Sequence, residues 1–138
     1  MSKVERFFVG PPIAIDTIKS ADSGGGVPTV AVAKAAGLVF TNGVVSNDPE
    51  TGKHVPGDIR VQTRRVLESL KLGLEKAGTS FENVVMVHAF LRDMKDWPAY
   101  HEVYIEYFPE LTPPPRYTVQ AEMASPELLV EIHMTAAA

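Results

Sequence analysis

The chain has 138 residues, of which 45% are hydrophobic, which is enough for one ordinary domain with a packed core. Its formal net charge of −4 argues against a general attraction to nucleic acid or to an anionic membrane surface. Because cysteine is absent, there is no disulfide framework, no thiol nucleophile and no cysteine-based metal site. No apolar run approaches the roughly 18 residues of a membrane span, and the N-terminus shows no signal-peptide pattern, so the sequence predicts a cytoplasmic protein.

Short strands are predicted in the first part of the chain. Segment 5–8 has the composition of a short strand, and segments 29–35 and 38–42 predict two strands joined by a turn at Gly37. Residues 48–52, Asp-Pro-Glu-Thr-Gly, have the composition of a turn.

A helix is predicted over residues 58–77. Apolar residues recur there at steps of three, four and seven, which is the spacing of a helix with one buried stripe. Asp58 is placed to cap its start and Gly78 to end it. The stripe consists of Ile59, Val66, Leu67, Leu70, Leu74 and Ala77.

A strand and a second helix follow. Segment 84–91 is β-branched and apolar at successive positions, which predicts a central strand covered on both faces. The second helix is expected over 97–108, with Asp96 as its cap and Pro98 in its first turn. Its stripe consists of Trp97, Tyr100, Tyr104, Tyr107 and Phe108.

Two last strands are predicted after the prolines at 113–115. They span 116–123 and 128–135 and form a hairpin across residues 124–127. The resulting order, two strands, helix, strand, helix and two strands, is typical of an α+β fold with helices layered on a sheet. No repeat or linker divides the chain, so residues 1–138 are expected to form a single domain.

The predicted hairpin carries the candidate catalytic and binding residues. Because side chains alternate along a strand, Arg116 and Thr118 share one face, as do Glu131 and His133. A turn centred near 124–125 places Thr118 opposite Glu131 and Arg116 opposite His133, which makes Arg116 and Glu131 diagonal neighbours. Two interpretations stay open. In the first, the pair is an exposed salt bridge. In the second, another subunit covers the pair, Arg116 anchors a carboxylate and Glu131 activates a water.

Several motifs, in chain order, resemble the RidA/YjgF family. Residues 112–119 (TPPPRYTV) resemble its P-x-R-x-x-V signature, and residues 129–132 (LVEI) resemble its V-E-I strand. The resemblance covers roughly residues 28–137 and leaves 1–27 as a divergent N-terminal extension. The other matching segments are Val39–Gly43 (V-F-x-S-G), Asp48–Gly52 (D-P-x-T-G), Gln62–Thr63, Leu74–Gly78, Asn83–Asp93, and Tyr104 with Phe108 (Y-x-x-x-F).

The resemblance implies a chorismate mutase-like RidA fold, in which a mixed β-sheet has two helices packed on one face. It also implies a homotrimer with three clefts between subunits. It implies hydrolysis of reactive 2-imino acids, or their enamine tautomers, to 2-keto acids and ammonia, without a metal or organic cofactor. The family's arginine, which clamps the substrate carboxylate, falls on Arg116, and its glutamate, which positions the water, falls on Glu131. Its Ser-Gly pair corresponds to Asn42 and Gly43. The expected partners are a small carboxylate substrate and further copies of the chain, with no nucleic acid and no membrane.

Four pocket positions depart from the family's best-known deaminases. Thr29 stands in place of a tyrosine, Asn42 in place of a serine, His101 in place of an asparagine, and Thr118 in place of a cysteine. The arginine that binds the substrate carboxylate and the glutamate that positions the water are kept, while other residues that line the pocket differ. This favours a different, larger imine or enamine acid, and a 2-aminomuconate-type deaminase is the natural candidate.

His101 has two interpretations: a partly exposed structural histidine, or a proton donor in the pocket whose pKa lies near neutrality. His88 and His133 lack the convergent ligands of a zinc site, so no metal is expected.

Two other functions remain as alternatives. The changed walls are compatible with a non-catalytic trimeric binder of small carboxylates. Some relatives have been described as ribonucleases or translation inhibitors, but the acidic balance of this chain argues against an RNA-directed role.

Overall fold

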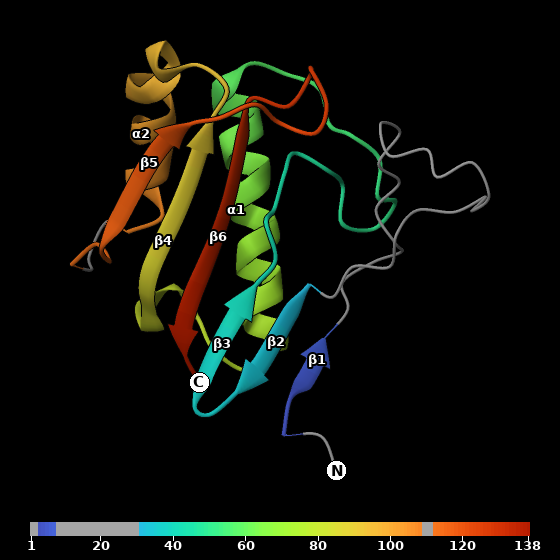
Figure 1. Ribbon diagram of the computed structural model, residues 1–138, viewed down its shortest axis with the longest axis vertical. Coiled ribbons are helices and arrows are strands. Elements are labelled where there is room, and N and C mark those ends of the chain that lie inside the picture. Colours follow the sequence, from blue (N-terminus) through green and yellow to red (C-terminus); the bar gives the residue numbers. More distant parts are fainter. Residues whose placement is uncertain (1–2, 8–30, 109–111) are drawn as a thin grey trace.

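A six-stranded sheet with two helices makes up the computed structural model, which describes residues 3–7, 31–108 and 112–138 (Figure 1). The strand order in the sheet is β1-β2-β3-β6-β4-β5. Only β4 and β5 run parallel among the paired strands described, so the sheet is mixed. The elements are β1 (Glu5–Phe7), β2 (Val32–Ala35), β3 (Leu38–Thr41), α1 (Ile59–Lys76), β4 (Val84–Leu91), α2 (Trp97–Glu106), β5 (Arg116–Gln120) and β6 (Val130–Ala137), with short 3-10 turns at Phe81–Asn83 and Met94–Asp96.

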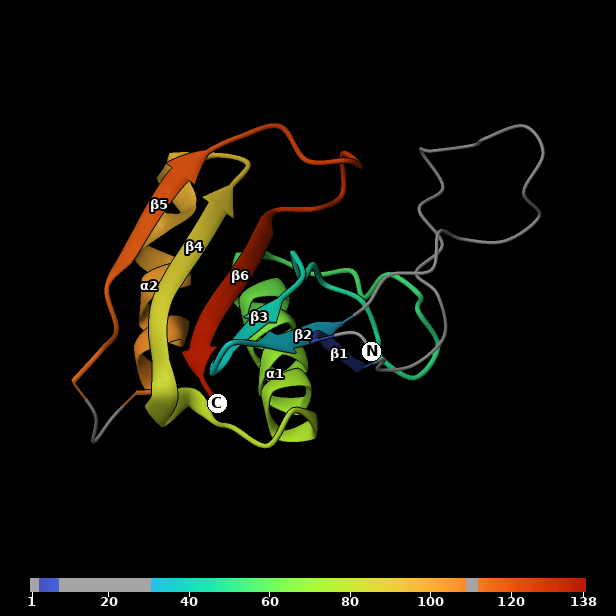
Figure 2. The ribbon, with the colours of Figure 1, turned by 60° about the horizontal axis from the view of Figure 1, so that its bottom comes forward.

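Both helices lie on the same face of the sheet, which confirms the predicted α+β architecture (Figure 2). Helix α1 packs against β3 and β6, and α2 lies beside α1, behind β4 and β5. The core fills the space between this face and the helices. Its fully buried members include Val39, Val66, Leu67, Val87, Ile132 and Met134.

The first strands and the turn agree with the prediction where they are described. Strand β1 pairs with β2, and β2 pairs with β3 around Gly37, whose φ of +77° suits a glycine. Residues 8, 29 and 30, which were predicted to belong to strands, lie outside the described part, as does most of the 1–27 extension. In the 48–52 turn, the Asp48 carboxylate accepts from the backbone N–H of Glu50 at 2.7 Å.

Helix α1 begins and ends as predicted. The Asp58 carboxylate accepts from the Val61 backbone N–H at 3.0 Å, which satisfies one of the free donors of the first turn. Gly78 follows the helix with a φ of +83°, the left-handed conformation that commonly ends a helix. The predicted stripe is buried throughout.

Strand β4 is central but is covered on one face only, so the prediction of cover on both faces is wrong for the single chain. Val87, Ala89 and Leu91 are fully buried beneath the helices. His88 and Phe90 point to the other face and are half-buried. The apolar residues on this open face have no covering layer within the described part of the chain.

The predicted hairpin between the last two strands is wrong. Strand β5 pairs in parallel with β4, so Arg116 lies opposite Val87 and Thr118 opposite Ala89, rather than opposite β6. Strand β6 instead lies between β3 and β4. The reason is the connection between the strands, which is a nine-residue loop, 121–129, and not a four-residue turn.

Arg92, at the end of β4, holds this loop. Its Nε donates to the Leu128 carbonyl at 2.8 Å, and its Nη2 donates to the Ser125 carbonyl at 2.6 Å. The bonds satisfy loop carbonyls that a hairpin would have paired with strand amides. They let β6 enter the sheet beside β4, two positions away from β5.

Helix α2 is shorter than predicted, and its cap differs. Asp96 occupies the cap position, but its side chain makes no capping bond. Asp93 caps the preceding 3-10 turn instead by accepting from the Lys95 N–H at 2.9 Å. At the other end, the amides of Tyr107 and Phe108 bond three residues back, at 3.2 Å each, so the last turn tightens and the α-helix ends at residue 106.

Candidate functional site

Strand β5 presents Arg116 to helix α2. The residue pairs with buried Val87, so its side chain lies on the helix-covered side of the sheet. Its Nη1 donates to the Tyr100 hydroxyl at 3.3 Å, and its Nη2 donates to His101 Nδ1 at 3.0 Å. Two consecutive residues of α2 thus orient the guanidinium group.

Three aromatic rings of α2 also surround this guanidinium. Its Cζ lies 4.1 Å from the ring centroid of Tyr104, 5.5 Å from that of Tyr100 and 5.8 Å from that of Trp97. At such distances a cation is attracted to the ring faces. Within the described residues, Arg116 forms no salt bridge with a carboxylate. Its charge is held by neutral acceptors and rings, and further N–H groups remain for an external anion.

The groups around Arg116 are neutral at pH 7. Burial raises the pKa of Tyr100 and raises that of Tyr104 to about 12. Burial lowers the pKa of His101, and the charge of Arg116 lowers it further. Because Arg116 donates to His101 Nδ1, the single proton of this imidazole resides on Nε2.

Thr118 joins the same cluster. It lies two residues after Arg116 on the same side of β5, and its Oγ1 is 3.3 Å from the Tyr100 hydroxyl. Three predicted pocket residues, Arg116, His101 and Thr118, are therefore brought together. Tyr100 links them and was missed as a site residue, because its place in the buried stripe of α2 indicated core packing alone.

Strand β6 presents Glu131 beside Gly43. An added Cβ at Gly43 would lie 3.1 Å from Glu131 Cδ and closer still to its Oε1, so only glycine leaves room for this carboxylate. Burial raises the pKa of Glu131. No hydrogen bond from the described part of the chain reaches the carboxylate.

The chain around Asn42 holds Gly43 against β6. The Asn42 N–H donates to the Ala31 carbonyl at 3.0 Å, and the Val44 N–H donates to the Ile132 carbonyl at 2.9 Å. The predicted pair Asn42 and Gly43 is therefore adjacent to Glu131. Thr29, the other residue predicted for this wall, lies outside the described residues.

Arg116 and Glu131 do not meet within one chain, which corrects the predicted diagonal pair. Glu131 pairs with Phe90, and Phe90 pairs with Val119. Cross-strand partners point to the same face, so Glu131 shares a face with Val119, while Arg116 points to the opposite one. The chain thus carries two half-sites: the Arg116 half-site (Arg116, Thr118, Trp97, Tyr100, His101 and Tyr104) and the Glu131 half-site (Glu131, Asn42 and Gly43).

The face that carries Glu131 is apolar and partly open. Phe40 is 43% exposed, Tyr117 47% and Val119 41%. His88 and His133 stack on this face with centroids 4.3 Å apart, and His88 Nδ1 lies 2.5 Å from the Tyr117 hydroxyl. Several exposed apolar side chains on one face of a sheet are typical of an interaction site.

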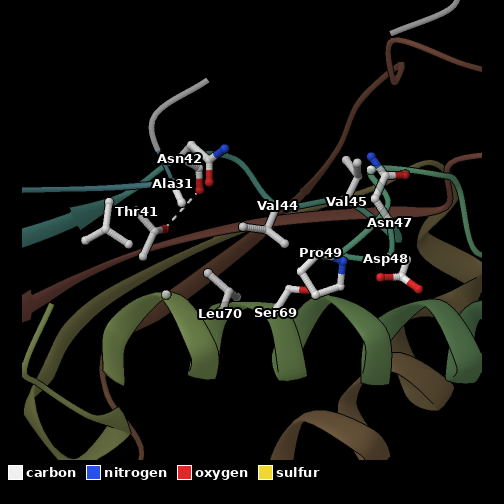
Figure 3. A pocket seen from close by; sticks show the side chains of 13 residues that line it. Ala31, Thr41, Asn42, Val44, Val45, Asn47, Asp48, Pro49, Ser69 and Leu70 are labelled. Atoms are coloured by element: carbon white, nitrogen blue, oxygen red, sulfur yellow. Dashed lines mark hydrogen bonds between the residues drawn. The ribbon is translucent and has the colours of Figure 1, made fainter. Parts of the chain in front are cut away.

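A cavity lies between α1 and the chain that follows β3 (Figure 3). Ser69 and Leu70 line it from the helix, and Val44 and Pro49 line it from the loop. The Ser69 hydroxyl is buried without a hydrogen-bond partner. Asn42 also lines the cavity, which therefore adjoins the Glu131 half-site.

In residues 3–7, 31–108 and 112–138, no three His, Cys, Asp or Glu side chains gather as a metal site requires. No helix in these same ranges combines the length and the apolar character needed to cross a membrane.

Comparison with known proteins places the chain in a family. Residues 27–138 match the model of the family described as Endoribonuclease L-PSP. The chain belongs to this family, the RidA/YjgF family. This confirms the resemblance that the motifs indicated.

Among RidA/YjgF relatives, the chain is similar to the 3-aminoacrylate deaminase RutC of Acinetobacter baylyi, with 43% identity over 105 residues, 76% of this chain and 82% of the relative. It is 41% identical to a RutC family protein of Pyrococcus abyssi over 103 residues, 75% of this chain and 80% of the relative. Among solved structures, Escherichia coli TdcF with bound serine matches with a TM-score of 0.79 and 26% identity, over 97% of this chain and 99% of that one. A deaminase activity is thus supported at the level of the family.

Proposed function

We propose that this chain hydrolyses reactive 2-imino acids, or their 2-enamine tautomers, to 2-keto acids and ammonia, in clefts between the subunits of a homotrimer. The observation that carries the proposal is the Arg116 guanidinium, which α2 orients with neutral acceptors and aromatic rings and which pairs with no carboxylate in the described residues. A 2-imino acid supplies the missing carboxylate, and a guanidinium binds a carboxylate with two parallel hydrogen bonds.

A second copy of the chain would unite the half-sites. Glu131 lies on the open face with Phe40 and Val119, and covering this face would remove apolar surface from water. Arg116 lies on β5, an edge strand of the sheet, where a neighbouring copy can reach it. In a closed threefold arrangement each copy gives its Arg116 half-site to one neighbour and its Glu131 half-site to the other.

The chemistry then follows from the two side chains. Arg116 holds the substrate carboxylate, and the Glu131 carboxylate accepts a proton from water as the water oxygen forms a bond to the imine carbon. That proton passes to the imine nitrogen and gives a carbinolamine. Glu131 then moves the proton of the new hydroxyl group to the same nitrogen, the carbon–nitrogen bond breaks, and ammonia leaves as the carbonyl forms. The pKa of Glu131 is raised by burial, which makes its ionised form a stronger base than an exposed carboxylate.

The similarity to a protein named 3-aminoacrylate deaminase supports an enamine carboxylate as substrate. The changed walls, with His101 and Thr118 in the Arg116 half-site, favour a substrate other than that of the best-known deaminases. A 2-aminomuconate-type compound remains a candidate.

The test is product formation from a panel of substrates. 2-Iminopropanoate, generated in place by an amino-acid oxidase, 3-aminoacrylate and 2-aminomuconate are each supplied, and ammonia and keto acid are measured. We expect Arg116→Ala to lower kcat/KM by at least about a hundredfold with the assembly intact, because truncating one partner of a buried charge pair costs about 3 kcal/mol. Arg64→Ala is the matched control, since Arg64 pairs with Glu106 on the exposed side of the helices. Full turnover by Arg116→Ala, or no turnover of any member of the panel by the unmodified protein, would overturn the proposal.

A further inference from the structure

The geometry points to His101 as a positioning residue, which aims the Arg116 guanidinium at the substrate carboxylate, with Trp97 holding the His101 ring in the required plane. The inference rests on the proposed function, because it assigns a role within the carboxylate anchor of that site. It differs from both sequence-based interpretations of His101, since the residue is neither merely structural nor a proton donor to the substrate.

Two acceptors orient the guanidinium group. Tyr100 accepts from Nη1 at 3.3 Å, and His101 Nδ1 accepts from Nη2 at the shorter distance of 3.0 Å. A planar guanidinium group whose two terminal nitrogens are both held by hydrogen bonds cannot turn about one of those bonds. With Tyr100 alone, the guanidinium could turn, and its remaining N–H groups would lose the parallel arrangement that a carboxylate needs.

Trp97 determines where His101 Nδ1 points. The two rings come from positions four residues apart on α2, which places them on the same face of the helix. Their centroids lie 4.5 Å apart and their planes differ by 13°, so the rings are stacked. The ring of Tyr104 is parallel to that of His101 within 17°. The imidazole is therefore held between flat neighbours, with its Nδ1 turned to Arg116.

The contact requires neutral His101. Arginine cannot give up its proton in a protein, so Nη2 is the donor, and a protonated imidazole has no acceptor to offer it. The titratable or charged groups that face His101 are Arg116 from β5 and Tyr104 from its own helix, and no carboxylate of the described residues pairs with it. Protonation would place a second positive charge against Arg116 and break the contact.

The experiment tests the hydrogen-bond acceptor of His101 separately from its flat ring. His101→Phe keeps a flat ring against Trp97 but removes the acceptor, whereas His101→Asn removes the ring but keeps a carbonyl acceptor. Glu102→Gln is the matched control, since it neutralises an exposed side chain on the next residue, which pairs with Arg60. Binding of pyruvate, the stable keto-acid product of 2-iminopropanoate, is measured by calorimetry, together with KM and kcat.

We expect His101→Phe to raise the Kd of pyruvate and the KM about tenfold, because a hydrogen bond to a charged group contributes roughly 1.5 kcal/mol or more, while kcat changes much less. His101→Asn should recover most of the affinity. In the unmodified protein the affinity for pyruvate should fall as the pH drops below 6.5, the ordinary pKa of histidine, because burial and Arg116 lower the pKa of His101. This dependence should be absent in His101→Asn. Trp97→Leu, which keeps the acceptor but frees the ring, should give an intermediate loss and serves if His101→Phe does not assemble.

Unchanged pyruvate binding in His101→Phe and Trp97→Leu, or the same pH dependence in His101→Asn, would overturn the inference. Arg116→Ala distinguishes this from failure of the proposed function. If Arg116→Ala loses pyruvate binding while His101→Phe keeps it, Arg116 remains the anchor and only the role of His101 is wrong. If Arg116→Ala also binds normally, the anchor itself is wrong.

Discussion

Replacement of Gly43 by alanine should disable the Glu131 half-site through one added methyl group. The new Cβ would lie 3.1 Å from Glu131 Cδ and nearer still to Oε1, well inside ordinary contact distance. The flexible end of the glutamate can give way, so the strand stays in place while the carboxylate moves by about 1 Å, a displacement that can cost a hundredfold in rate. We therefore expect Gly43→Ala to lower kcat by about a hundredfold, because the water is no longer held at the imine carbon.

The assay is keto-acid formation from 2-iminopropanoate, with the melting temperature recorded alongside. Gly37→Ala is the matched control, since Gly37 has a φ of +77° and nothing within 4 Å of an added Cβ. That change should cost stability of about 1 kcal/mol through backbone strain and leave kcat unaltered. Wild-type kcat in a folded Gly43→Ala protein would refute the reasoning, and an equal loss in both variants would trace the effect to stability.

Two further predictions follow from the pKa shifts. Burial raises the pKa of Glu131, which means that the fold disfavours the ionised form of this side chain. At pH 7 the ionised carboxylate therefore lowers the stability of the folded state. Glu131→Gln should raise the melting temperature by a few degrees while abolishing turnover. A scanning calorimetry trace without any rise would contradict this. Burial first, and the charge of His88 second, lower the pKa of His133, so the fold favours its neutral form. The folded state therefore has its full stability above pH 6.5, the ordinary pKa of histidine, and loses stability as the pH falls below it. His133→Phe keeps a flat ring beside His88 and should weaken this dependence of melting temperature on pH, whereas an unchanged profile would exclude His133 as its source.

The helices and most strands could be predicted because their signals are local. The stripe of α1 repeats over five turns, and its ends carry Asp58 and Gly78, so period and caps agree. The start of α2 was predicted at the right residue but with the wrong capping bond, because Asp96 precedes the helix yet its side chain makes no such bond, while Asp93 caps the 3-10 turn before it.

The partner of β5 could not be predicted because the deciding contacts are distant in sequence. The segment 124–127 has the composition of a hairpin turn, and that local signal favoured pairing of β5 with β6. Arg92 lies more than 30 residues upstream of Ser125 and Leu128, whose carbonyls it binds. The alternation of side chains along a strand shows which residues share a face. It does not show whether a local turn or a distant hydrogen-bond donor decides which strands pair.

The candidate site was predicted residue by residue but not in its arrangement. Arg116, His101 and Thr118 lie together, and Asn42 and Gly43 lie beside Glu131, but the wrong strand pairing placed the two groups on one face. The aromatic rings under Arg116 were missed as part of the site. The spacing of these residues on α2 indicated core packing alone, but Tyr100 and Tyr104 are both buried in the core and close to the Arg116 guanidinium.

The placement of Arg116 and Glu131 on opposite faces of the sheet has a genetic consequence. In an assembly built as proposed, each cleft draws its two halves from different polypeptides. A chain that lacks Arg116 and a chain that lacks Glu131 are each inactive alone, yet a mixed trimer contains clefts in which both halves are intact. Co-expression of two dead alleles would then restore part of the activity, and the unit on which selection acts would be the pair of neighbours rather than the single chain.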